Sequence, residues 1–211
     1  MLKRRHGIAL LLILFSSGAS LRAQQSGNPA LHTYRSPDGS LSFQYSDALV
    51  LCQQPPKEEG SWKPDACLAY MPICPNQEST GIMACLAVKP GPAEKNTTFD
   101  GAAFSVLDLG PANSEAACLN AAWHSSSSGD WPVRKKINGA DFRVTEIGGA
   151  AAGHWTDGHA YVTLHRGRCY ELESIITGVD GQDTDPPTKN FDKDPVKKAI
   201  DLPLSTFKFL K

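Results

Sequence analysis

The second half of the chain is a run of short apolar segments separated by residues that favour tight turns. Four segments have the length of a strand, at residues 133–137, 141–147, 160–165 and 169–176. Asn138 and Gly139 separate the first two and give a strong hairpin signal, because both residue types tolerate the positive φ of a two-residue turn. Turns this short join antiparallel strands. The sequence therefore predicts an antiparallel meander.

Strand and helix signals are also found outside this meander. A turn at residues 36–40 predicts a hairpin between strands at 33–35 and 41–45, and the apolar pattern predicts further strands at 48–52, 67–71 and 82–88. Helical spacing of apolar residues predicts helices at 101–109, 115–123 and 196–202. Strands in meanders with helices grouped between them indicate an α+β fold, an antiparallel sheet with helices packed on it.

The first 23 residues have the pattern of a cleavable signal peptide. A basic start is followed by an apolar run over residues 7–15, which is too short to span a bilayer because a spanning helix needs about 20 residues. Cleavage after Ala19 or after Ala23 fits the small residues that follow, and we prefer Ala23. We therefore expect a secreted or periplasmic protein with no membrane span after cleavage.

The mature chain left by cleavage at Ala23 has 188 residues, the size of a single domain. We expect a flexible mature N-terminus at 24–32 and one domain over 33–211. With 17 basic and 22 acidic residues the mature chain is mildly acidic, which excludes nucleic acid as the default partner. Another exported protein is the expected partner. The basic segment 134–136 is interpreted as an exposed strand edge that lysines protect from pairing with other edges.

All six cysteines follow the signal-peptide segment, so export would place them in an oxidising compartment. Three disulfides are expected, and six cysteines allow 15 connectivities. One short Pro-containing segment lies between two cysteines, and another pair joins a predicted helix to a predicted strand. The favoured set is Cys67–Cys74, Cys118–Cys169 and Cys52–Cys85.

No motif of a known catalytic centre occurs in the sequence. It has no C-x-x-C, no H-E-x-x-H, no P-loop, no G-x-S-x-G and no Rossmann glycine fingerprint. We therefore expect a protein that is not an enzyme and that needs no cofactor.

One candidate metal site lies in the predicted hairpin of residues 160–165 and 169–176. A three-residue loop at 166–168 would place the polar side chains of both strands on one face. A two-residue turn would instead set Glu171 beside Val162 and bury a charge, so the three-residue loop is preferred. The residues gathered in that register are His159, His165, Glu171 and Glu173.

This set of imidazoles and carboxylates could bind a divalent cation or a polar partner. The alternative interpretation is a solvated face, or a face covered by a helix held through Cys169.

Several short segments resemble the PsbP-like α/β/α sandwich proteins. They are the turn and strand at 34–43, Ile137-Asn138-Gly139 before the meander, the late strand at 168–172, and residues 205–209 at the end of the chain. Uncharacterised secreted bacterial members of this kind share the Cys-Tyr-Glu-Leu strand. The resemblance covers most of residues 33–211. It implies an α/β/α sandwich and a non-enzymatic role in binding or assembly, and a metal-assisted hydrolase acting at the polar hairpin face is the alternative.

Overall fold

The structure, a computed structural model, describes residues 29–52, 74, 81–89, 96–122, 133–181 and 188–211. The predicted signal peptide and the predicted strand at 67–71 lie outside these residues. The described helices are α1 (Glu115–Ala121) and α2 (Lys193–Thr206). The strands are β1 (Leu31–Arg35), β2 (Leu41–Ser46), β3 (Leu49–Leu51), β4 (Gly81–Val88), β5 (Phe99–Pro111), β6 (Val133–Ile137), β7 (Ala140–Ala151), β8 (His154–His165), β9 (Arg168–Val179) and β10 (Lys208–Phe209).

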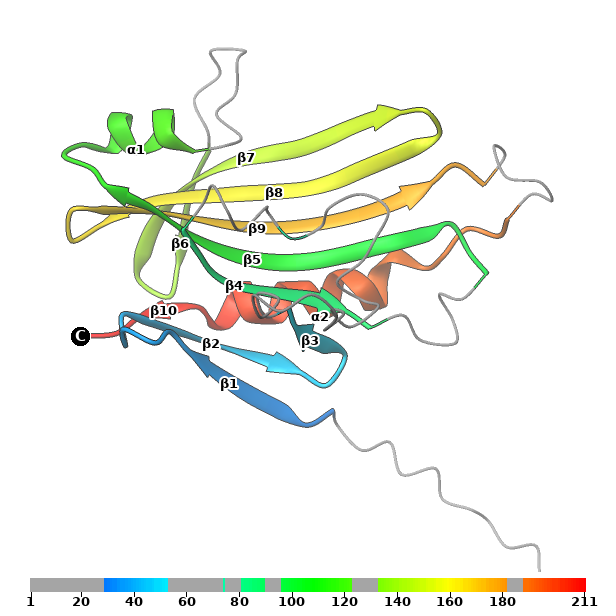
Figure 1. Cartoon of the computed structure of the whole chain (residues 1–211), viewed down its shortest axis with the longest axis horizontal. Helices are drawn as coiled ribbons and strands as arrows, with labels where there is room; N and C mark the ends of the chain where they lie inside the picture. The colour runs from blue at the N-terminus through cyan, green and yellow to red at the C-terminus, as the bar shows by residue number, and fades with distance from the viewer. Residues whose placement is uncertain (1–28, 53–73, 75–80, 90–95, 123–132, 182–187) are drawn as a thin grey trace, which may run out of the picture.

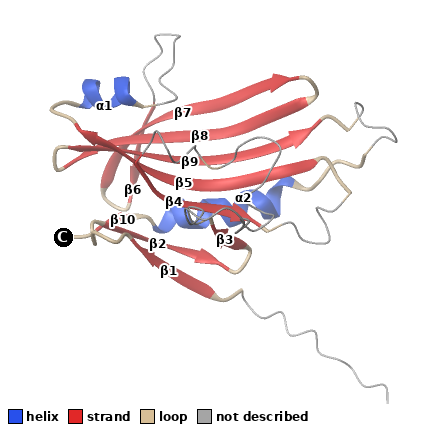
Figure 2. Ribbon diagram, in the orientation of Figure 1, coloured by secondary structure: helices blue, strands red, loops and turns tan. Residues whose placement is uncertain are grey.

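A seven-stranded antiparallel sheet in the order β3-β4-β5-β9-β8-β7-β6 forms the centre of the molecule (Figure 2). A smaller sheet, β1-β2-β10, lies beside it together with the C-terminus (Figure 1). The predicted α+β class and the predicted antiparallel meander are confirmed. The Asn138-Gly139 turn is also confirmed, with φ of 46° and 90° at the two residues.

One described helix packs on each face of the large sheet. α2 and the small sheet pack on one face, where Phe43 and Phe104 meet edge to face with ring centroids 5.4 Å apart in the main core. α1 packs on the other face, where Cys118 and Val162 belong to a separate apolar cluster. We call these the α2 face and the α1 face. The arrangement is the predicted sandwich of a sheet between helical layers.

Residues 101–109, which the sequence predicts as a helix, form the middle of β5 instead. β5 lies between β4 and β9, and residues 101–107 are all buried because both faces of the sheet are covered. A strand buried on both faces lacks the polar alternation of a half-buried strand, so its apolar residues can fall at helical spacing by chance. The helix predicted at 115–123 is confirmed as α1, whose first turn is capped by Ser114 Oγ accepting from the amide of Ala117.

The β8–β9 turn differs from the predicted three-residue loop at 166–168. Arg166 and Gly167 alone form the turn, with φ of 51° and 75°, which matches a two-residue hairpin turn. Val162 consequently lies opposite Glu171 and Leu164 opposite Cys169. The prediction was wrong because the cost of burying a carboxylate did not override the turn geometry.

The disulfides match the favoured set at one pair. Cys118 and Cys169 are bonded as predicted, with Cα atoms 5.3 Å apart. Cys74 is bonded to Cys85, which contradicts the predicted pairs Cys52–Cys85 and Cys67–Cys74. Cys52 is also disulfide-bonded, and Cys67 lies outside the described residues.

The close packing of these sulfurs explains why the pairing could not be predicted. The amide of Cys52 donates to the carbonyl of Cys85 at 2.8 Å, since β3 leads directly into this position beside β4. The Sγ atoms of Cys52, Cys74 and Cys85 all lie within 4.8 Å of one another. More than one pairing is therefore compatible with the path of the chain, and spacing along the sequence does not distinguish them.

Candidate functional site

The structure separates the four residues that were predicted to share a metal site. Glu171 lies opposite Val162 and Glu173 opposite Ala160, so both carboxylates are on the α1 face. Both are buried, and Ser105 Oγ lies 2.9 Å from a carboxylate oxygen of Glu173, to which it donates. The solvated alternative is therefore wrong for these two glutamates, and the Cys118–Cys169 bond attaches α1 to the same face of the sheet.

His159 and His165 lie on the α2 face, because they are an even number of residues from Tyr161, which belongs to the main core on that face. Their register partners in β9 are Ser174 and Arg168. His165 stacks on Phe209 with ring centroids 3.9 Å apart and planes 2° apart. Burial, and secondarily the charge of Arg166, lowers the pKa of His165, so it packs as a neutral ring. The predicted set of His159, His165, Glu171 and Glu173 is therefore not one site, because the sheet lies between its histidines and its glutamates.

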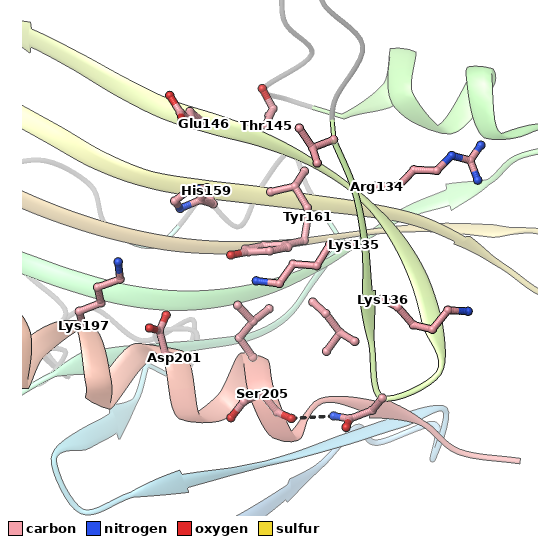
Figure 3. A pocket seen from close by; sticks show the side chains of 15 residues that line it. Arg134, Lys135, Lys136, Thr145, Glu146, His159, Tyr161, Lys197, Asp201 and Ser205 are labelled. Carbon is pink, nitrogen blue, oxygen red and sulfur yellow. Dashed lines mark hydrogen bonds between the residues drawn. The ribbon is translucent and has the colours of Figure 1, made fainter.

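A groove of about 770 Å³ lies on the α2 face, between the edge of the large sheet and α2 (Figure 3). It includes His159 but none of the other three predicted metal residues. Its lining comes from β6, β7, β8 and α2: Val133, Arg134, Lys135, Lys136, Ile137, Asn138, Val144, Thr145, Glu146, His159, Tyr161, Lys197, Asp201, Leu204 and Ser205.

The turn between β6 and β7 fixes one end of this groove. The side-chain amide of Asn138 donates to the backbone carbonyls of Ser205 at 2.7 Å and Phe207 at 2.8 Å. These bonds hold the hairpin tip against the end of α2, as the dashed line to Ser205 in Figure 3 shows. The sequence identified the turn but gave no sign of what its side chain would contact.

Register decides which side chains face into the groove. Lys135 lies opposite buried Phe142, so it points to the α2 face, and Figure 3 shows it directed toward Tyr161. The Lys135 Nζ atom lies 5.4 Å from the centroid of the Tyr161 ring. Burial raises the pKa of Tyr161, and the charge of Asp201 raises it further. The Tyr161 hydroxyl is therefore protonated at neutral pH and can donate a hydrogen bond.

The groove holds charged groups of both signs that form no salt bridge among the described residues, although Lys135 lies over the Tyr161 ring. Over the described ranges, no salt bridge involves Lys135, Lys197, Glu146 or Asp201. The neighbouring β6 residues differ, because Arg134 pairs with Glu115 at 3.3 Å and Lys136 with Asp141 at 3.0 Å. The groove-facing charges are thus available to a ligand.

The sequence analysis predicted the β6 side of this groove but not the α2 side. Residues 134–136 were correctly assigned to an exposed strand edge, since β6 ends the large sheet. Lys197 and Asp201 are about 60 residues away in the chain, and no sequence pattern indicates that the sheet edge curves toward α2. In β6 only Ile137, next to the turn, is buried, so the strand has no apolar alternation that would mark its groove-facing side.

No helix within the described ranges is both long and apolar enough to cross a membrane. A scan against protein-family models gives no match. A search of curated proteins also gives no match.

Two solved structures have a similar chain path. One is the solution structure of cyanobacterial PsbP (CyanoP) from Synechocystis sp. PCC 6803, at a TM-score of 0.45 and 14% identity, covering 88% of this chain and 96% of that chain. PsbP is the family that the sequence resembles. The other is a crystal structure from Bacteroides thetaiotaomicron, at a TM-score of 0.43 and 10% identity, covering 85% of this chain and 48% of that chain. At these values no residue role is transferred from either structure.

Proposed function

We propose that the protein is exported and works as a non-catalytic binding or assembly domain whose contact surface is the groove between β6 and α2. Export is supported by the buried Cys118–Cys169 bond and the Cys74–Cys85 bond, because such bonds persist in oxidising compartments.

One observation carries the binding role. The groove presents the Lys135 and Lys197 ammonium groups, the Glu146 and Asp201 carboxylates and the protonated Tyr161 hydroxyl, and within the described residues none of these forms a salt bridge or hydrogen bond. Concave surfaces with a few convergent polar groups on an apolar lining are typical ligand sites. Val133, Ile137, Val144 and Leu204 supply the apolar part of this lining.

A metal-assisted hydrolase at the late hairpin is not proposed. That activity required histidines and glutamates on one face, and the β8–β9 register puts His159 and Glu171 on opposite faces of the sheet.

Site-specific photo-crosslinking in the producing cell tests the proposal. A photoreactive phenylalanine analogue at Val133, which is 75% exposed at the groove rim, should give a discrete adduct. The same analogue at Leu31, 57% exposed on the small sheet, is the matched control and should give none. Lys135→Glu should weaken the Val133 adduct. Equal adducts from both positions, or none from Val133, would contradict a binding role for the groove.

A further inference from the structure

The outer edge of β6 has backbone groups directed away from the sheet. Within the described part of the chain β6 pairs with β7 alone. Ile137 and Ala140 flank the two-residue turn and so form a hydrogen-bonded pair, after which bonded and non-bonded pairs alternate. Arg134 and Lys136 fall in the non-bonded pairs, so their N–H and C=O groups point outward and can form a ladder with an added strand.

The charges of β6 decide what kind of strand can be added. The strand carries Arg134, Lys135 and Lys136 in succession and no acidic residue, although the whole chain has a net charge of −1. An antiparallel pair of two β6 strands centred on Lys135 would place cations opposite cations. Like charges directly opposite are destabilising, so a second copy of this chain is disfavoured as the occupant.

We propose that an extended acidic segment of a partner protein adds to β6 as a further strand of the large sheet. This inference rests on the proposed function and names the partner chemistry for the same groove. Backbone bonds to Arg134 and Lys136 would supply affinity, and alternate side chains would supply specificity. Side chains on the α2 face would meet Lys135 and exposed Val133 within the groove.

Side chains on the α1 face would meet Arg134 and Lys136. Both cations already have acidic partners in the protein, but these are exposed pairs, with the Arg134 and Lys136 side chains 66% and 64% exposed. Exposed salt bridges contribute little and exchange readily, so these cations can turn to acidic residues on the added strand.

Synthetic peptides test strand addition without knowledge of the natural partner. The probe is a short peptide of consecutive Glu residues flanked by Val and Thr, titrated into the oxidised protein and followed by backbone amide NMR. We expect saturable shifts at Arg134 and Lys136, with affinity that falls as salt is added. Lys135→Glu should weaken binding about tenfold, whereas Lys198→Glu, the same change on α2 outside the groove, should leave it unchanged.

Two N-methylated versions of the peptide provide the decisive control. In one version every second residue is N-methylated, so one edge of the peptide keeps its amides and can still face β6; in the other version every residue is N-methylated, so neither edge can donate a backbone hydrogen bond. Strand addition predicts that the first version binds like the parent and the second does not bind. Equal binding of both versions, binding of a Lys-containing peptide in place of the Glu peptide, or no binding would overturn it. If the peptide tests fail but the Val133 crosslink still forms, the groove remains a binding surface, and only the addition of a strand to β6 is contradicted.

Discussion

Glu171 lies directly across the β8–β9 ladder from Val162, with its side chain fully buried on the α1 face. This pairing follows from the two-residue turn at Arg166 and Gly167. One additional residue in the turn would have turned the glutamates toward His159 and His165. The length of one turn therefore determines that the acidic residues are buried on the α1 face while His159 lines the open groove.

The turn itself can be tested at Gly167. Its φ of 75° strains any residue with a Cβ atom, although the space around that Cβ is open. We expect Gly167→Ala to lower the free energy of unfolding by about 1–2 kcal/mol, measured by urea denaturation. Gly149→Ala is the control, because the Cβ there also meets nothing within 4 Å and the backbone has no positive φ. Similar losses for both variants would show that the turn geometry is not responsible.

The Cys118–Cys169 bond should act as a single stabilising unit. It links α1 to β9 across 51 positions of sequence, and in a chain-entropy model a closed loop of that size contributes about 4 kcal/mol. Cys118→Ala and Cys169→Ala should each lose this stability, and the double variant should lose little more because each change removes the same bond. Additive losses in chemical denaturation would contradict this pairing.

Local signals in the sequence predicted the turn between β6 and β7 and the exposed edge of β6. Asn138 and Gly139 fix their hairpin through their own backbone preferences, and residues 134–136 show an exposed strand by their charge. Interior strands were harder to predict, because residues 101–107 in β5 are buried on both faces and lack alternation.

The predicted site failed for a different physical reason. Its residues were assigned to one face by assuming that Glu171 could not be buried, yet it is 0% exposed. Whether a carboxylate is buried depends on tertiary partners such as Ser105, which donates to the neighbouring Glu173 from 68 positions away. The groove was missed for the same kind of reason, since Tyr161 and Asp201 are brought together only by the curvature of the sheet toward α2.

Docking of α1 should depend on pH through Glu115. The hydrogen bond from Arg143, at 2.7 Å, and the charges of Arg143 and Arg134 hold the pKa of Glu115 below its ordinary value of 4.5. Because the folded-state pKa is lowered, the stabilisation is present above pH 4.5 and is lost as the pH falls through the folded pKa. The stability difference between the wild type and Glu115→Gln should therefore shrink toward acidic pH in denaturation curves.

A double variant tests whether the stabilisation by Glu115 comes from its ion pair with Arg143 or from its charge alone. In the Glu115→Gln background, Arg143→Gln should cost less stability at neutral pH than it does in the wild type, since the ion pair with Glu115 is already lost. A pH-independent difference between wild type and Glu115→Gln, or full additivity with Arg143→Gln, would show that the ion pair does not hold α1.

Asn138 should control how firmly the β6 wall of the groove is held against α2. Asn138→Asp keeps a residue that tolerates positive φ but replaces the donating amide with a carboxylate facing the carbonyl oxygens of Ser205 and Phe207. We expect a loss of about 1–2 kcal/mol and faster hydrogen exchange at β6 amides. Asn138→Gly also removes both hydrogen bonds, but it relieves the strained backbone and adds no repulsion, so it should lose less. Equal stability and exchange in wild type and both variants would show that the groove wall is held by packing of β6 and β7 alone.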